Sequence, residues 1–340
     1  MKTKMKKIKK PALCLLVMCA YLLMTSQIFA GDTSAEKKES KSWSLVILPD
    51  TQNYASEYPG LLHLQTLWIL ENKDKYNIVY VLQNGDLVNN NSDEIQWQNV
   101  SQAFARLDGK VPYAISFGNH DFGPDGSTKD RTTFANQYFP VSRFEKWTTF
   151  GGVMEAGKVD NTYHTFNAAG QDYLIFCLEF GPRNEVLEWV NKIITEHPLH
   201  KIIFMTHAYL YSDSTRYDWA TKKEQQSWNP HSYPMTNTTI NDGQEIWDKV
   251  VKKHPNSFMT INGHVCNNDG LGFLTSTADN GNNVHQILVD YQHLPVGGGA
   301  WLMILNFSAD EKIIKVETYS PLYEKFNTDP NNQFIINIQN

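Results

Sequence analysis

Five apolar segments of this 340-residue chain each end in a polar side chain that can bind a metal ion. The segments have the length and composition of β-strands. Between the first three of them, apolar residues recur at the spacing of a helix. Because the carboxyl ends of parallel strands share one edge of a sheet, we expect the side chains that follow them to lie together. These side chains are Asp50 with Gln52, Asp86, Asn119, His207 and His264. The alternation of strands and helices predicts an α/β fold with an at least partly parallel sheet.

The rest of the chain continues this alternation with a larger share of strands. Predicted helices cover residues 61–72, 95–107, 184–197 and 242–253. Predicted strands cover residues 44–49, 77–82, 111–116, 163–167, 173–179, 201–206, 257–261, 284–291, 300–306 and 312–319. Residues 208–240 show neither pattern and are rich in Tyr, Trp, Ser and Asn. A loop this long inside a compact domain is usually functional, and its aromatic residues and His231 could reach the site or simply fix the loop.

The chain divides into four parts by composition. Residues 1–30 read as a signal peptide, residues 31–42 as a polar tether, residues 43–319 as one domain and residues 320–340 as a C-terminal extension. A single domain of this size can bury a core large enough to fold without disulfide bonds.

The first thirty residues have the layout of a secretory signal. Six lysines lie among the first ten residues, and the 13 residues from Ala12 to Met24 form an apolar stretch that is followed by a polar segment ending at Ala30. A membrane span needs about 20 apolar residues, so an uncleaved anchor is the less favoured alternative. A lipoprotein signal at Cys19 fits poorly because Met18 precedes the cysteine. We therefore expect a secreted, periplasmic or cell-surface protein that leaves the membrane after cleavage behind Ala30.

The net charge of the chain beyond residue 30 disfavours some classes of binding partner. The formal net charge is −6, and residues 1–30 hold six lysines and no acid, so the remainder carries −12. A chain this acidic has no general electrostatic attraction to nucleic acid or to an anionic membrane. We expect no stable nucleic-acid partner.

Two cysteines remain after the predicted cleavage, Cys177 and Cys266. Two cysteines in a chain of this length do not form a disulfide framework. Cys177 lies in a predicted buried strand and Cys266 follows the Gly263-His264 turn, so a bridge between them is the less favoured alternative.

The residue types at the strand ends indicate a metal site. Carboxylates, amide oxygens and imidazoles are ligands for Mn, Fe or Zn. One shared carboxylate can hold two ions about 3.5–4 Å apart, which is the arrangement of two-metal phosphoryl hydrolysis. Glycines next to these residues, at positions 85, 118 and 263, would permit sharp turns with positive φ.

The polar strand ends resemble the calcineurin-like metallophosphoesterase superfamily. The family's motifs occur here in the family's order, and they span nearly the whole domain. They are Asp50-Thr51-Gln52, Gly85-Asp86, Gly118-Asn119-His120-Asp121, His207 and Gly263-His264. The resemblance implies a two-sheet β-sandwich flanked by helices, with layers α/β/β/α, and a dinuclear metal site at the strand ends.

The resemblance also implies roles for individual residues. Asp86 would bridge two divalent ions, with Asp50, Gln52 and Cys266 on the first and Asn119, His207 and His264 on the second. His120 would stabilise or protonate the leaving-group oxygen, and Asp121 would orient and charge His120. A metal pair lowers the pKa of a bound water, which supplies a hydroxide nucleophile at neutral pH.

Two positions depart from the family pattern. Gln52 and Cys266 stand where the family usually has histidine. An amide oxygen is a weaker ligand than imidazole, and a thiolate favours softer ions such as Zn. We therefore expect the first ion to bind more weakly, to exchange, or to be a different metal. Alternatively, Cys266 does not bind the ion. The Asp-Thr-Gln opening resembles that of secreted bacterial members, and the absence of a Gly-Asp-x-x-Tyr element argues against the purple acid phosphatase branch.

These observations favour an exported metal-dependent phosphoesterase that acts on phosphomonoesters or phosphodiesters. Two alternatives remain open: a catalytically weak or inactive surface binding protein on the same fold, and an extracellular nuclease. Taken singly, each residue also has a structural interpretation, since Asp50 or Asp86 could cap a turn and His207 or His264 could be structural.

Overall fold

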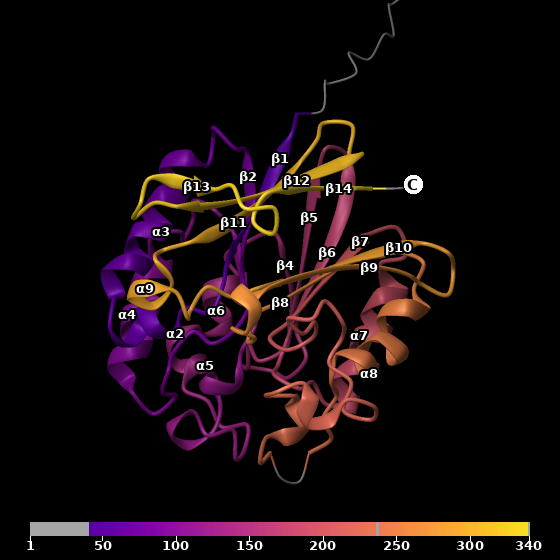
Figure 1. Cartoon of the computed structure of the whole chain (residues 1–340), viewed down its shortest axis with the longest axis horizontal. Helices are drawn as coiled ribbons and strands as arrows, with labels where there is room; N and C mark the ends of the chain where they lie inside the picture. The colour runs from indigo at the N-terminus through magenta and orange to yellow at the C-terminus, as the bar shows by residue number, and fades with distance from the viewer. Residues whose placement is uncertain (1–40, 236–237, 339–340) are drawn as a thin grey trace, which may run out of the picture. The chain divides into compact units, whose positions relative to one another are not determined.

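The computed structural model describes residues 41–235 and 238–338, which form one domain (Figure 1). The predicted signal peptide and nearly all of the predicted tether lie outside the described residues. Within the described part of the chain, no helix is both long enough and apolar enough to cross a membrane.

The first sheet has seven strands and joins both ends of the domain. Parallel pairing connects β1, β2 and β3, and antiparallel pairing connects β1 to β11, β11 to β12, and β12 to both β13 and β14. The strands are β1 (Trp43–Leu48), β2 (Ile78–Gln83), β3 (Tyr113–Ile115), β11 (Leu302–Phe307), β12 (Ile313–Ser320), β13 (Lys325–Asn327) and β14 (Phe334–Asn337).

The second sheet also has seven strands, in the order β4-β5-β6-β7-β8-β10-β9. Its centre, β6-β7-β8-β10, is parallel, and the strands at both edges are antiparallel. The strands are β4 (Phe150–Val153), β5 (Thr162–Ala168), β6 (Gln171–Leu178), β7 (Lys201–Thr206), β8 (Ser257–Asn262), β9 (Leu271–Thr277) and β10 (Asn283–Val289).

Helices cover the outer face of each sheet. Figure 1 shows α3 (Pro59–Asn72) and α4 (Glu94–Ala105) beside the first sheet, and α7 (Asn184–Glu196) and α8 (Gly243–Lys249) beside the second. The buried positions of α7 are Val186, Leu187, Val190, Ile193 and Ile194, the spacing of one apolar helix face. Shorter helices α2 (Gln52–Ser56), α5 (Ala135–Tyr138), α6 (Val141–Phe144) and α9 (Pro295–Gly298) lie in the connections.

Alternation along the strands separates two apolar clusters. In β1, Leu45 and Ile47 belong to the cluster between the sheets, whereas Val46 and Leu48 belong to the cluster beneath the helices. All six residues of β1 are buried, which explains why the strand reads as a continuous apolar run. The predicted α/β/β/α two-sheet sandwich is therefore confirmed.

Four strands were not predicted from the sequence: β4, β9, β13 and β14. They lie at or near sheet edges and have several half-buried or exposed positions, so they lack a strong apolar pattern. β13 and β14 fall in the predicted C-terminal extension, and both pair with β12. The predicted extension therefore adds two short strands to the first sheet of the domain.

Candidate metal centre

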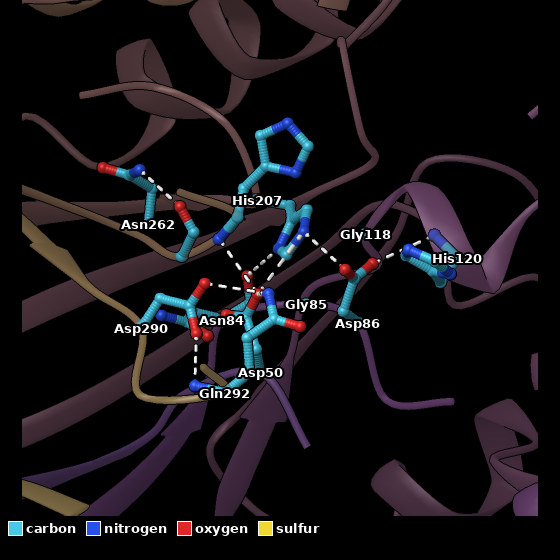
Figure 2. A network of polar contacts seen from close by, with 12 residues as sticks. Asp50, Asn84, Gly85, Asp86, Gly118, His120, His207, Asn262, Asp290 and Gln292 are labelled. Carbon is cyan, nitrogen blue, oxygen red and sulfur yellow. Dashed lines mark hydrogen bonds and ion pairs between the residues drawn. The ribbon is translucent and has the colours of Figure 1, made fainter. Parts of the chain in front are cut away.

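The predicted ligand positions meet at one end of the two sheets. Asp50 follows β1 and Asp86 follows β2 in the first sheet, while His207 follows β7 and His264 follows β8 in the second. The backbone N–H of His264 donates to Asp50 Oδ2 at 3.0 Å across 214 positions of sequence, and His207 Nε2 lies 3.1 Å from Asp86 Oδ2. The carboxyl ends of the parallel strands thus form one site between the sheets (Figure 2).

Asp86 lies at the centre of this site. One carboxylate oxygen contacts His207, and the other accepts the backbone N–H of His120 at 3.0 Å. His207 Nε2 also lies 3.9 Å from Asp50 Oδ2. Asp86, His207 and His264 are all buried and offer ligand atoms within 4.8 Å of one another. This is the tightest part of the predicted ligand set.

Backbone carbonyls fix the orientation of both imidazoles. His207 Nδ1 lies 2.9 Å from the carbonyl of Asn84, and His264 Nε2 lies 2.8 Å from the carbonyl of Trp228. A carbonyl can only accept, so these nitrogens carry protons, and in the neutral form of each ring the other nitrogen offers a lone pair. Histidine ligands of metal sites are usually held in this way.

Four buried oxygens near the site accept no hydrogen bond from any described residue. They are Asp50 Oδ1, Gln52 Oε1, Asn84 Oδ1 and Asn119 Oδ1. A buried acceptor without a partner costs about 1–3 kcal/mol, so a group of four requires an explanation. Divalent cations bind oxygens of this kind, and the donor set therefore fits the metal ions that the sequence predicts.

A small cavity of about 210 Å³ opens over the site. It is lined by Gln52, Asp86, Asn119, His120, Trp228, Tyr233, His264, Cys266 and Gln292. The predicted site residues thus supply six of the nine. Asp50 and His207 lie beneath them, buried and in contact with the lining residues.

Cys266 lies on the cavity wall as a half-buried free thiol, and Cys177 is a free thiol in the core. The alternative of a bridge between the two cysteines is therefore wrong. Burial, with smaller contributions from Asp290 and Asp50, raises the pKa of Cys266. Without a metal the thiol remains protonated at neutral pH, and its role as a ligand stays a prediction.

The predicted partnership of His120 and Asp121 is not observed in the expected form. The Nδ1 of His120 lies 2.8 Å from the carbonyl of Asn89, which orients the ring. Asp121 instead accepts the backbone N–H groups of Gly118, Leu87 and Val88 at 2.8–3.2 Å. Because all three contacts hold backbone, Asp121 fixes the loop that carries His120 and is no partner of the ring.

Gly118 and Gly263 do not have the predicted positive φ. They are needed because the backbone at these positions lies too close to a carboxylate of the site for a side chain to fit. Of the three, only Gly85 has a positive φ, at 113°. A Cβ at Gly118 would lie 2.1 Å from Asp86 Oδ1, and one at Gly263 would lie 2.0 Å from Asp50 Oδ1. Any side chain at these two positions would displace a carboxylate of the site.

Opposite charges balance one another around Asp86 and His207. Burial alone would raise the pKa of Asp86, but the imidazoles of His207 and His120 outweigh burial and hold it below its usual range. Burial alone would lower the pKa of His207, but Asp86 and Asp50 raise it to about 10. In the metal-free chain a proton on His207 therefore supplies positive charge that a bound cation would supply instead.

Burial raises the pKa values of the other carboxylates at the site. Burial and the neighbouring Asp290 raise the pKa of Asp50 well above its usual value. Burial also raises the pKa of Asp290 to about 6, and burial together with Asp86 raises that of Asp121 to about 7. A cation that stabilised the ionised forms would lower these pKa values, which again fits a metal centre.

The long segment 208–240 closes one side of the cavity. Trp228 and Tyr233 line the cavity, and the Tyr233 ring packs edge-on against Phe180 with a centroid distance of 4.9 Å. His231 does not reach the site, because its Nε2 lies 2.6 Å from Glu245 Oε2 on α8. The loop therefore contributes the Trp228 carbonyl and two aromatic side chains, and His231 anchors it.

Three further residues of the site are not among the predicted ones: Asn84, Asp290 and Gln292. Asn84 is the residue directly before Gly85-Asp86; its carbonyl lies 2.9 Å from His207 Nδ1, and its Oδ1 is buried without a partner among the described residues. Asp290 and Gln292 follow β10, which is parallel to β8 and so ends at the same edge. The predicted strand ran through Tyr291 and concealed this strand end. A polar side chain directly after an apolar run was the signal that could have identified them.

A four-layer sandwich with carboxylates, amides and imidazoles gathered at its strand ends defines a metallohydrolase scaffold. Comparison with known proteins agrees with this class, because residues 44–233 match the family model of the calcineurin-like phosphoesterases. The chain belongs to the calcineurin-like phosphoesterase family.

Individual proteins resemble the chain over most of its length. It is 31% identical over 286 residues to the uncharacterized protein YvnB of Bacillus subtilis (strain 168), an alignment that covers 82% of this chain but only 20% of YvnB. The purple acid phosphatase PPD1 of yellow lupin (Lupinus luteus) has a similar fold, with a TM-score of 0.51 and 15% identity over 88% of this chain and 54% of that protein. The chain thus spans about a fifth of its curated relative and about half of this structural neighbour.

Proposed function

We propose that the chain is an exported metal-dependent phosphoesterase that hydrolyses phosphomonoesters or phosphodiesters. The observation that carries this proposal is the group of four unpartnered buried oxygens beside the Asp86-His207-His264 cluster. Buried oxygens without a partner also occur elsewhere among the described residues, but these four gather beside imidazole and carboxylate groups, and together they form the donor set that divalent cations bind.

The residues divide into two ligand sets that share Asp86. Asp50, Gln52 and Cys266 would hold one ion, and Asn119, His207 and His264 would hold the other. When bound, such ions supply a nucleophile at neutral pH and neutralise the phosphoryl oxygens. The family uses centres of this kind, and donors of these types suit Mn, Fe or Zn.

His120 would act on the leaving group. It lines the cavity, and the hydrogen bond to Asn89 orients its ring with Nε2 as the remaining nitrogen. A proton delivered from Nε2 to the departing oxygen would prevent an alkoxide from accumulating. Asp121 would serve this step indirectly by holding the backbone on both sides of the site.

The cavity favours a small charged group over a long polymer. Among the described residues that line it, none is a lysine or an arginine. A substrate phosphate would therefore rely on the metal ions and His120 for its charge, and a polyanionic strand would find no basic surface there. This argues for an ester of small size and against the nuclease alternative.

A paired assay tests the proposal. The chain from Gly31 onward would be incubated with a chromogenic phosphomonoester and its diester analogue, after chelation and again after addition of Mn or Zn, and bound metal would be counted. Turnover that requires metal supports the phosphoesterase, and the preferred ester defines the substrate class. Absence of turnover on both esters with two ions bound would overturn the proposal for these substrate classes.

One observation favours a second candidate, a binding protein on the same fold. Gln52 and Cys266 both face the cavity in place of the usual histidines. If the protein binds one ion or none and hydrolyses neither ester, this candidate is the better one.

Export has a separate test. The lysine-rich start and the apolar stretch up to Met24 support a cleaved signal. Mass spectrometry of the protein recovered from the culture medium or periplasm would show a chain that begins at Gly31. Retention of residues 1–30 on the membrane would favour the anchor.

A further inference from the structure

Gln292 lies on the wall of the metal site although none of the family's motifs includes it. It is the third residue after β10, and like His264 it lies outside the region 44–233 that matches the family model. The site's five ligand-bearing segments come from earlier in the chain. Its position therefore needs an explanation of its own.

The side-chain amide of Gln292 bridges two buried carboxylates. Its Nε2 donates to Asp290 Oδ2 at 2.9 Å and to Asp50 Oδ2 at 3.2 Å (Figure 2). Asp290 also accepts the backbone N–H of Gln292 through Oδ1 at 2.8 Å. Both amide protons are thus used, and Asp290 fixes the backbone and the side chain of Gln292 together.

This bridge determines how Asp50 is presented. Asp50 Oδ2 accepts Gln292 Nε2 and the backbone N–H of His264. Asp50 Oδ1 has no partner among the described residues and is buried. Hydrogen bonds on one oxygen therefore hold the carboxylate with the other oxygen free for a ligand.

A second contact ties Gln292 to the same segment. Asn53, the residue after Gln52, donates from Nδ2 to the backbone carbonyl of Gln292 at 3.0 Å. Gln292 thus contacts the 50–53 segment on both sides of Gln52, through its side chain and through its backbone. Two hydrogen bonds therefore connect this segment to the residue that follows β10 by three positions.

We propose that Gln292 is a positioning residue of the first metal ion, which aligns the Asp50 carboxylate by bridging it to Asp290. This inference rests on the proposed metal centre. The neutral oxygen of Gln52 is a weak ligand, so the affinity of that ion depends strongly on the placement of its anionic ligands. Residues that orient a ligand in this way typically change metal affinity by about 10–100-fold when they are replaced.

The test measures metal binding directly and needs no substrate. Gln292→Met keeps the length of the side chain and removes both hydrogen bonds. Metal dissociation constants would be obtained by competition with a chromophoric chelator, using Mn or Zn alone as the probe. We expect one of two ions to bind about 10–100-fold more weakly and the other to bind as in the wild type, with activity restored by excess metal.

A matched variant controls for general damage. Gln286→Met removes a buried glutamine from β10 itself, where its Nε2 bonds Ser276 away from the site. It should leave both dissociation constants unchanged. Wild-type affinity for both ions in Gln292→Met, or equal loss in both variants, overturns the inference.

A second variant keeps the test decisive if Gln292→Met does not fold. Asp290→Asn retains the shape of the bridge but cannot accept both the backbone and the side-chain N–H of Gln292. It should weaken the same single ion, and unchanged affinity in this variant overturns the inference. Failure of the proposed function would appear differently, as two ions bound normally without hydrolysis of either ester.

Discussion

His207 Nε2 lies 3.1 Å from Asp86 Oδ2, and both side chains are buried where the two sheets meet. The pair joins the first sheet to the second, so the site exists only when both sheets are folded and packed. The carbonyl of Asn84, two residues before Asp86, accepts from the other nitrogen of the same imidazole at 2.9 Å. One turn after β2 therefore both supplies the central carboxylate and orients its partner.

Replacement of Asp86 should remove the centre. In Asp86→Ala we expect loss of both ions and a fall in turnover of at least about 10³-fold, since a metal centre supplies several kcal/mol of transition-state stabilisation. Metal content measured by elemental analysis and the rate on the preferred ester check this.

A remote buried carboxylate serves as the control for Asp86. Asp160 bonds Asn136 and contributes nothing to the site, so Asp160→Ala should retain its metal. Activity retained in Asp86→Ala would contradict the bridging role.

Replacement of His120 should separate chemistry from metal binding. In His120→Ala we expect unchanged metal content and turnover about 10²–10⁴-fold lower, the usual effect of losing a proton donor. The loss should be larger for an alkyl ester than for a nitrophenyl ester, because nitrophenolate leaves without protonation. Steady-state rates on both esters check this, and an equal loss on both would argue against proton delivery.

The strand ends could be predicted because two separate signals coincide there. Apolar runs mark the strands, and a residue such as Asp50 or His207 directly after a run has few other reasons to be polar. Parallel strands then bring their carboxyl ends together whatever the details of the loops. Fold and most of the cavity lining follow from this reasoning.

The remaining features depend on exact backbone paths. The close approach of Gly118 to Asp86, or the bond from His264 to the Trp228 carbonyl, arises from loop geometry that no periodicity encodes. Asp121 shows the same limit, since a carboxylate beside a histidine in sequence bonds three backbone amides in space. Sequence spacing indicates which residues meet but not which atoms bond.

A histidine at position 266 should increase the affinity of the site for the first metal ion. Burial raises the pKa of the Cys266 thiol, so ligation there requires loss of a proton, whereas a neutral imidazole needs none. In Cys266→His we expect higher metal occupancy after dialysis against a fixed concentration of free Mn. Cys266→Ser removes the thiol without adding an imidazole and should not raise occupancy. Unchanged occupancy and rate in Cys266→His would show that this position does not contribute to the centre.

A buried histidine remote from the cavity should make the fold sensitive to acid. His164 on β5 is fully buried between Tyr80 and Thr162, whose hydroxyls lie 3.0 and 3.1 Å from its ring nitrogens. Burial lowers its pKa to about 3, whereas an unfolded histidine has a pKa of about 6.5. Between these values the unfolded chain binds a proton that the folded chain does not.

This difference fixes the sign of the pH dependence. The contribution of His164 is fully present above pH 6.5 and is lost as the pH falls, by about 1.4 kcal/mol per pH unit for one proton. Urea unfolding of the chelated protein at several pH values between 7.5 and 4.5 would give the slope. In His164→Gln we expect the free energy of unfolding to fall less steeply with acid than in the wild type.

His231 offers a control of opposite sign. Its hydrogen bond to Glu245 raises its pKa, so its contribution is present at low pH and is lost as the pH rises through the raised value. In His231→Gln the free energy of unfolding should therefore decrease more steeply as the pH falls than in the wild type. In His164→Gln it should decrease less steeply. Because both variants remove one imidazole, a common effect on the unfolded chain would shift both slopes in the same direction, and opposite shifts can come only from the folded environments. Parallel slopes for His164→Gln and the wild type would show that His164 is not what destabilises the fold in acid.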